Sequence, residues 1–183
     1  MQNLQSFQNK NFNRGASKLK ELLWMLCSAL FFQHSLALLN GFKITLLRTF
    51  GASVGKGVLI KPRVQIKFPW KLKIGNHVWI GEGVWIDNLA EVTIEDNVCI
   101  SQGAYLLTGN HNYKKTSFDL ITSPILLKES AWIGAKTTVC PGVTVHTGAI
   151  LTVGSIATKD LEANGIYKGN PALKVGNRLY NSG

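Results

Sequence analysis

His111 is the side chain in this sequence best suited to move a proton. It lies within the run Gly109-Asn110-His111-Asn112-Tyr113, whose other members are small or polar. A neutral imidazole near pH 7 can take the proton of a hydroxyl group as that oxygen attacks an electrophile. The same histidine could equally be a surface residue satisfied by local hydrogen bonds. The position of His111 in the fold distinguishes these two interpretations.

The sequence does not identify the group that would orient this imidazole. Asp87, Asp119 and Glu129 are carboxylates that could reach it, although exposed acids on loops are usually only solvated. The chain has three cysteines, which are widely separated and outside any C-x-x-C spacing. Neither a disulfide framework nor a zinc site is therefore indicated. We expect a cytoplasmic protein whose chemistry requires no metal.

The composition is that of a basic, folded protein. The 183 residues fit one domain with a small appended element, and 45% hydrophobic residues are enough for a buried core. A formal charge of +10 favours polyanionic partners such as nucleic acid, anionic lipid or a phosphorylated small molecule. The basic residues are scattered and form no nucleic-acid-binding signature, so we expect no nucleic acid partner.

An apolar run, residues 22–32, lies near the N-terminus. Four basic residues precede it: Lys10, Arg14, Lys18 and Lys20. Gln33 and His34 end the run well short of the roughly 18–20 residues that span a membrane, and no signal cleavage site follows directly. We therefore expect an N-terminal extension, residues 1–50, whose apolar helix packs on protein or lies on a membrane surface.

A six-residue period fills the rest of the chain. Aliphatic residues recur at this spacing in four groups: Val54, Ile60 and Ile66; Ile74, Ile80 and Ile86; Ile94, Ile100 and Leu106; and Leu127, Ile133, Val139, Val145 and Leu151. The first three groups start 20 residues apart, so each holds three six-residue units and two extra residues. Three short strands and an enlarged corner describe one turn of a triangular coil.

Two other positions repeat in phase with the aliphatic residues. The fourth residue after them suits an inward position on a short strand: Val58, Val64, Val78, Val84, Val98, Ala104, Val143 and Ala149. The third residue tolerates positive φ at a tight corner: Gly57, Gly83, Asn97, Gly103, Gly109, Gly142, Gly148 and Gly154. A β-sandwich would alternate with period two and turn about every 8–12 residues, so the phased glycines favour stacked coils.

The six-residue period breaks after His111. Residues 114–124 have no such phase, so we expect a loop excursion over about residues 112–126. Aliphatic side chains fill the inside of stacked coils, which leaves the outer faces and loops for chemistry. His111 stands at the base of the excursion, where its imidazole can project from a rigid coil. This position favours the catalytic interpretation.

The repeat resembles that of the left-handed β-helix acyltransferases of the hexapeptide kind. It reads I-G-N-H-V-W, I-G-E-G-V-W, I-E-D-N-V-C, I-S-Q-G-A-Y and, later, W-I-G-A-K-T, V-C-P-G-V-T and V-H-T-G-A-I, within residues 54–175. Gly-Asn-His-Asn-Tyr, followed by Phe118, is similar to the stretch that carries the catalytic histidine in colanic-acid-type and maltose- or galactoside-type O-acetyltransferases. Further motifs are similar to the colanic acid branch: residues 47–52, Pro69-Trp70, Val84-Trp85-Ile86, residues 99–106 and Gly169-Asn170-Pro171-Ala172.

The resemblance implies an all-β fold, a single-stranded left-handed parallel β-helix over residues 51–183 with an N-terminal helical segment and a C-terminal tail. It implies that acetyl-CoA is the co-substrate and that His111 is the general base. The acceptor is then a sugar hydroxyl in exopolysaccharide or other surface-glycan biosynthesis. The maltose and galactoside enzymes use an asparagine one coil earlier, and residues 81–88 offer no clean equivalent. The candidate acceptor contacts are Trp85, Asp87, Asn110 and Tyr113.

The resemblance also implies a donor site and an assembly. The candidate donor residues are Gly134, Ala135, Val153, Thr158, Lys159, Lys174 and Arg178, of which the three cations could neutralise the phosphates of CoA. Family members hold acetyl-CoA and the histidine between neighbouring subunits, so we expect a homotrimer. The basic flank of the N-terminal helix allows peripheral contact with the inner face of a membrane.

Three alternatives remain open. An N-acyltransferase acting on an amino sugar would use the same donor site. A noncatalytic β-helix scaffold would use the N-terminal helix as its functional element. A γ-type carbonic anhydrase needs three histidine ligands, and the histidines here, His34, His77, His111 and His146, lack a second member close after His111.

Overall fold

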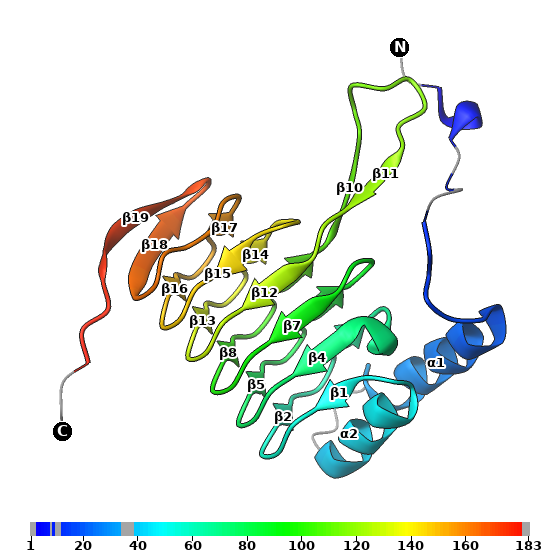
Figure 1. Ribbon diagram of the computed structural model, residues 1–183. Helices are drawn as coiled ribbons and strands as arrows, with labels where there is room; N and C mark the ends of the chain where they lie inside the picture. The colour runs from blue at the N-terminus through cyan, green and yellow to red at the C-terminus, as the bar shows by residue number, and fades with distance from the viewer. Residues whose placement is uncertain (1–2, 8, 10–11, 34–38, 181–183) are drawn as a thin grey trace.

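The computed structural model describes residues 3–7, 9, 12–33 and 39–180. Lys10 and His34, named above, lie outside these residues. The described chain forms a prism of stacked coils, with helices at one end and the C-terminal strands at the other (Figure 1). A two-stranded excursion leaves one edge of the prism about halfway along it.

The parallel strands of the described residues form three sheets, one on each side of the prism. Sheet A contains β1 (Ser53–Val54), β4 (Leu72–Ile74), β7 (Val92–Ile94), β12 (Ile125–Leu127) and β15 (Thr144–Val145). Sheet B contains β2 (Leu59–Ile60), β5 (Trp79–Ile80), β8 (Cys99–Ile100), β13 (Trp132–Ile133), β16 (Ile150–Leu151), β18 (Gly165–Gly169) and the antiparallel β19 (Ala172–Asn177). Sheet C contains β3 (Gln65–Ile66), β6 (Trp85–Asp87), β9 (Tyr105–Leu107), β14 (Thr138–Val139) and β17 (Ile156–Ala157). We name the edges AB, BC and CA after the sheets that they join along the chain.

The strand register confirms the predicted period. Val54 pairs with Ile74, and Ile74 pairs with Ile94, so the first coils are 20 residues long. Ile94 then pairs with Leu127 across the excursion, and Leu127 pairs with Val145, which shortens the coil to 18 residues. The two extra residues of the early coils lie at the CA edge. The excursion is therefore a further enlargement of a corner that is already enlarged.

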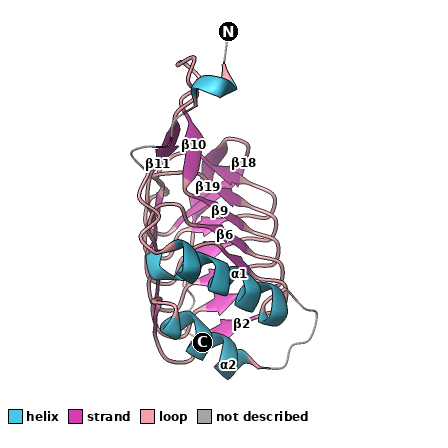
Figure 2. Ribbon diagram, turned by 90° about the vertical axis from the view of Figure 1, so that its right-hand side faces the viewer, coloured by secondary structure: helices cyan, strands magenta, loops and turns pink. Residues whose placement is uncertain are grey.

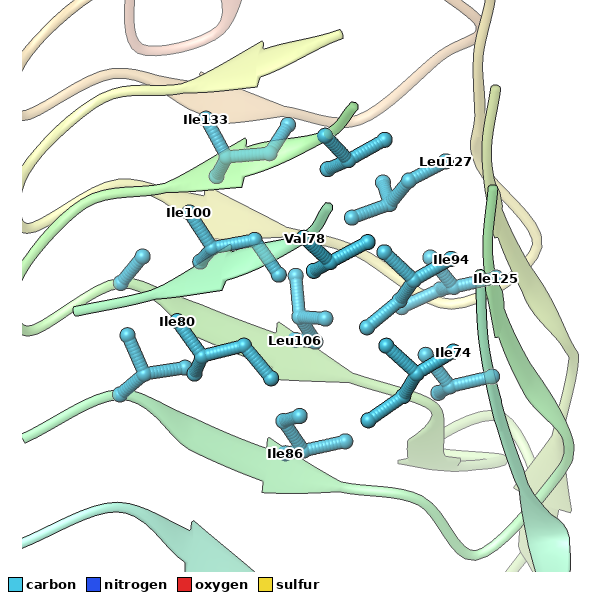
Figure 3. Packing of buried hydrophobic residues seen from close by; sticks show 14 of the residues in the cluster. Ile74, Val78, Ile80, Ile86, Ile94, Ile100, Leu106, Ile125, Leu127 and Ile133 are labelled. Carbon is cyan, nitrogen blue, oxygen red and sulfur yellow. The ribbon is translucent and has the colours of Figure 1, made fainter. Parts of the chain in front are cut away.

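The repeated aliphatic residues form the core (Figure 3). Ile80, Ile86 and Leu106 have no exposed surface, and the smaller inward residues, such as Val78 and Val84, are equally buried. Each such side chain contributes about 1.5–3 kcal/mol on leaving water. Stacked ladders of this kind leave little room inside for polar groups, as expected.

The corner positions follow the prediction with an exception. Gly57, Asn97 and Gly148 have positive φ, as do the other predicted corner glycines apart from Gly109. Gly109 lies instead in a strand, β10 (Gly109–His111), and a Cβ there would meet Leu89 Cδ1 at 2.6 Å. The expectation of a corner at Gly109 is therefore wrong, because the chain leaves the coil at this point to form the excursion.

Helices at the N-terminal end cover the first coil. α1 (Lys18–Phe31) begins after Ser17, whose hydroxyl accepts the N–H of Lys20. A second helix, α2 (Asn40–Thr49), was not predicted, because its sequence has only a weak amphipathic pattern. Figure 2 shows both helices against the base of the prism.

Side chains of the helices bond the open edge of the first coil. Asn40 Oδ1 accepts the Ile60 N–H at 2.8 Å, and its Nδ2 donates to Val58 O at 2.9 Å. Arg48 Nη2 donates to Val54 O at 2.7 Å, and Trp24 Nε1 donates to Ile66 O at 2.8 Å. These bonds replace the strands of a preceding coil, so further strands cannot add to this end. No described helix is both long and apolar enough to cross a membrane.

Candidate functional site

The excursion is a β-hairpin that carries His111 at the end of its first strand. β10 pairs antiparallel with β11 (Leu120–Thr122), and His111 lies opposite Leu120. The hairpin leaves the CA edge immediately after Thr108, whose hydroxyl donates to Asp87 O at 2.8 Å. Thr108 is fully buried, so the base of the hairpin is fixed to the preceding coil.

The carbonyl oxygen of Phe118 orients the imidazole of His111. Nδ1 of His111 lies 2.8 Å from Phe118 O. A carbonyl oxygen can only accept a hydrogen bond, so Nδ1 carries the proton in this contact. The neutral ring then has its free lone pair on Nε2. His111 is thus held in the tautomer that a general base acting through Nε2 requires.

Phe118 also fixes the plane of the imidazole. Its ring stacks on that of His111 with centroids 4.3 Å apart and planes 5° apart. Phe118 has a φ of +50°, which is uncommon for a residue other than glycine. This left-handed backbone brings the carbonyl and the ring of one residue to the same histidine. Sequence reasoning placed Phe118 in the motif but did not identify this role.

Of the three candidate carboxylates, Asp119 and Asp87 have other partners, and Glu129 lies elsewhere in the fold. Asp119 forms an ion pair with Lys115 at 3.1 Å, and hydrogen bonds from Ser117 and Lys115 hold the pKa of Asp119 below its usual value. Asp87 Oδ1 lies 3.1 Å from Lys67 Nζ, without hydrogen-bond geometry. Glu129 lies at the AB edge, away from the hairpin, with its N–H donating to Glu95 Oε2.

Two of the candidate acceptor residues, Trp85 and Asp87, lie on β6 of sheet C, with Asp87 at the CA end of this strand. The Trp85 ring stacks on Tyr105 with centroids 4.7 Å apart, and 40% of Trp85 is exposed. Burial, together with Asp87, raises the pKa of Tyr105 to about 12, so its hydroxyl stays protonated and donates to Asp87 Oδ2 at 3.3 Å. An outward aromatic platform therefore stands beside a nearly buried carboxylate.

The other two candidate acceptor residues lie in the hairpin. Asn110 Oδ1 accepts the His111 N–H at 2.8 Å, so this amide oxygen is already bonded to the backbone beside the imidazole. Tyr113 is exposed. A groove of about 440 Å³ runs between α1 and sheet C and is bordered by Trp85, Lys67 and Phe68. The platform and this groove thus lie on sheet C, and the hairpin leaves from the CA edge of the same sheet.

Three of the candidate donor residues lie together at the BC edge. Gly134, Ala135 and Val153 line a groove of about 430 Å³ that extends across three successive coils, with Trp132 on its sheet B side. A Cβ on Gly134 would come within 2.6 Å of Leu151 O on the next coil. Backbone groups and apolar side chains therefore form a narrow wall there.

The structure separates the remaining candidate donor residues. Thr158 and Lys159 follow β17 at the CA edge. Lys174 forms an ion pair with Glu162 at 2.7 Å. Arg178 donates to Ser130 O at 3.0 Å, on the AB edge. A single chain therefore does not gather these three cations around one phosphate group.

Among the described residues, no group of three or more His, Cys, Asp and Glu side chains is arranged to hold a metal ion. His77 and His146 follow strands of sheet A at the AB edge, on another edge of the prism from His111.

Phe7, which sequence reasoning missed altogether, has its ring 5.9 Å from that of His111.

Known proteins resemble the chain over most of its length, and one of them over nearly all of it. It is 37% identical over 179 residues, 98% of each chain, to the "Putative colanic acid biosynthesis acetyltransferase WcaF" of Escherichia coli strain K12. It is 29% identical to the galactoside O-acetyltransferase of the same organism, over 72% of this chain and 66% of that protein. No protein-family model matches the sequence.

Solved structures show the same fold. A hexapeptide-repeat-containing acetyltransferase from Vibrio cholerae O1 biovar eltor, complexed with acetyl coenzyme A, superimposes with a TM-score of 0.82. The sequences are 20% identical, and the match covers 94% of this chain and 96% of that one. The predicted left-handed parallel β-helix is thereby confirmed. By its sequence and its fold, this chain belongs to the hexapeptide-repeat acetyltransferases of the colanic acid biosynthesis type.

Proposed function

We propose that the protein transfers an acetyl group from acetyl-CoA to a sugar hydroxyl in surface-glycan biosynthesis, with His111 as the general base. The observation that carries this proposal is the bond from His111 Nδ1 to Phe118 O, which leaves Nε2 free to accept a proton. His111 would take the hydroxyl proton as the oxygen attacks the thioester carbonyl. The protonated His111 would then give this proton to the CoA sulfur as the carbon–sulfur bond of the thioester breaks.

The surface around His111 suits a sugar. Carbohydrate sites combine an exposed aromatic face with a few fixed polar groups. Trp85 and Tyr105 supply such a face, and Asp87 and Lys67 supply polar groups beside it. A colanic acid acetyltransferase and a galactoside O-acetyltransferase among the relatives support an acceptor of this class.

The groove at the BC edge suits the pantetheine arm of acetyl-CoA. That arm is long and narrow, with amide groups along an aliphatic chain. The groove offers apolar walls from Trp132 and Val153, with backbone groups at Gly134 and Ala135. The acetyl-CoA complex of a structural neighbour supports the same co-substrate here.

The separation of the two halves of the site supports a homotrimer. His111 stands at the CA edge, whereas the donor groove lies at the BC edge, across the width of sheet C. A neighbouring copy could bring its BC edge against the CA edge of the first. Closed threefold packing would form the same contact three times, with every site built from two chains.

We further propose that α1 contacts the cytoplasmic face of a membrane. Five apolar side chains on its outer surface are each more than half exposed: Leu19, Leu22, Met25, Leu26 and Leu30. They form a stripe along a helix about 21 Å long, and the net charge of +10 favours anionic lipid.

Replacing Leu22 and Leu26 together by Gln should weaken binding to anionic lipid vesicles at least about tenfold, as judged by vesicle flotation. The matched control is Leu173→Gln, because Leu173 is also exposed but lies at the other end of the prism. If the wild-type protein remains in the buffer fraction and does not float with the vesicles, it does not contact membranes in the proposed way. A loss of assembly in the double variant would assign the stripe to a neighbouring subunit instead.

The proposed activity is tested with acetyl-CoA and a panel of sugars and amino sugars. We expect thiol release coupled to a mass increase of one acetyl group on a neutral sugar, at a position that mild base removes. A base-stable product formed only on amino sugars would indicate an N-acyltransferase. Calorimetry that detects no acetyl-CoA binding to the purified protein would support the noncatalytic scaffold.

A further inference from the structure

Described residues of the N-terminal segment contact the CA edge at two places (Figures 1 and 2). Near the first coil, Trp70 Nε1 donates to Arg14 O at 2.6 Å and Lys71 Nζ donates to Asn13 O at 2.7 Å. The Lys71 ammonium also lies 4.8 Å from the centre of the Phe12 ring. These contacts hold residues 12–15 against the CA edge, between β3 and β4.

The second contact is made at the hairpin itself. The N–H of Asn3 donates to Thr116 O at 2.9 Å. Asn3 also begins η1 (Leu4–Ser6), because its side chain accepts the N–H of Gln5 at 3.0 Å. Phe7 ends this short helix. The backbone bond to the hairpin therefore sets the position of Phe7.

Phe7 packs against the imidazole of His111. The two ring centroids are 5.9 Å apart, with planes at 53°. His111 thus has a hydrogen bond at Nδ1, a stacked ring from Phe118 and a tilted ring from Phe7. The chain supplies this last contact from a residue more than 100 positions away in the sequence.

We propose that Phe7 is a positioning residue for the reaction, holding the His111 imidazole so that Nε2 meets the acceptor hydroxyl. This inference rests on the proposed role of His111 as the base. The stacked Phe118 ring fixes the plane of the imidazole, yet allows it to slide within that plane. A second ring at an angle limits the sliding. Displacing a general base by about 1 Å can lower the reaction rate by up to roughly 100-fold. Even the smaller displacement that loss of the Phe7 contact would allow should therefore be measurable.

Phe7→Ala should lower kcat about tenfold and leave the KM for acetyl-CoA within about twofold, since Phe7 contacts the ring of the proposed base and does not line the donor groove. Phe7→Tyr should restore most of the rate, because it returns the ring. The matched control is Leu4→Ala, because Leu4 belongs to the same segment, is exposed and should leave kcat unchanged.

A spectroscopic measurement separates positioning from general stability. With ¹³C-labelled histidine, the Cε1–H resonance of His111, assigned by its loss in His111→Asn, should shift in Phe7→Ala because the ring current of Phe7 is removed. It should not shift in Leu4→Ala. A Phe7→Ala protein with wild-type kcat, or with an unmoved His111 resonance, would overturn the proposal. The resonance is read without substrates, so a failure of the proposed acetyl transfer would show separately, as a wild-type protein without turnover.

Discussion

Replacing His111 by Asn or Ala should reduce acetyl transfer about 10²–10⁴-fold while acetyl-CoA still binds. The loss follows from the place of Nε2, the ring nitrogen that has its lone pair free. The rate is measured as thiol release with the acceptor found in the sugar panel. Acetyl-CoA affinity is measured by calorimetry on the same preparations.

His111→Asn is the more informative of the two variants. An asparagine amide nitrogen can still donate to Phe118 O, so the hairpin keeps the bond that fixes its geometry. Its amide offers no group that takes a proton near pH 7. The matched control is His146→Asn, since His146 is partly buried and lies at the AB edge. Wild-type turnover in purified His111→Asn would exclude His111 as the base.

The fold is predictable from the sequence because each coil repeats the same local rule. An aliphatic residue every sixth position, with a small inward residue between, fixes which side chains face the axis. Ile74, Ile94 and Leu127 illustrate this, since they occupy one ladder despite the 13 additional residues of the coil between Ile94 and Leu127. Among the predicted corner positions, all of which the structure describes, Gly109 at the break is the exception.

The contacts of the candidate site are less predictable because they join distant residues or depend on backbone conformation. The sequence indicates His111, but not that Phe118 would adopt positive φ and present its carbonyl to Nδ1. Phe7 has no periodic pattern that could relate it to the hairpin. Lys174 and Arg178 are expected near phosphate from the family resemblance and their charge, whereas the fold pairs one with Glu162 and the other with Ser130 O.

Replacing Gly134 by Ala should weaken acetyl-CoA binding at least about tenfold, which corresponds to ~1.4 kcal/mol. A Cβ at this position would lie 2.6 Å from Leu151 O and 2.8 Å from Val153 N. Both atoms belong to the backbone of the next coil, so the coils must separate at the donor groove. Overpacking of this kind typically costs about 1–3 kcal/mol of stability as well.

Gly154→Asn is the matched control for Gly134→Ala. Gly154 lies at the same BC edge, and a Cβ there meets no atom within 4 Å. Its φ of +68° is one that asparagine adopts more readily than most residues. This variant should retain acetyl-CoA affinity. If Gly134→Ala also binds acetyl-CoA like the wild type, the donor site does not lie in this groove.

Co-expression of His111→Ala chains with Gly134→Ala chains then tests whether each site is shared between subunits. In a mixed trimer, some sites pair an intact His111 from one chain with an intact donor groove from its neighbour. With random assembly of equal amounts, such sites are about a quarter of the total, so about a quarter of the wild-type rate should return at low acetyl-CoA concentration. If both halves of a site came from one chain, every site would carry one defect. The rate would then not exceed the residual level of the Gly134→Ala protein, and the proposed arrangement between subunits would be wrong.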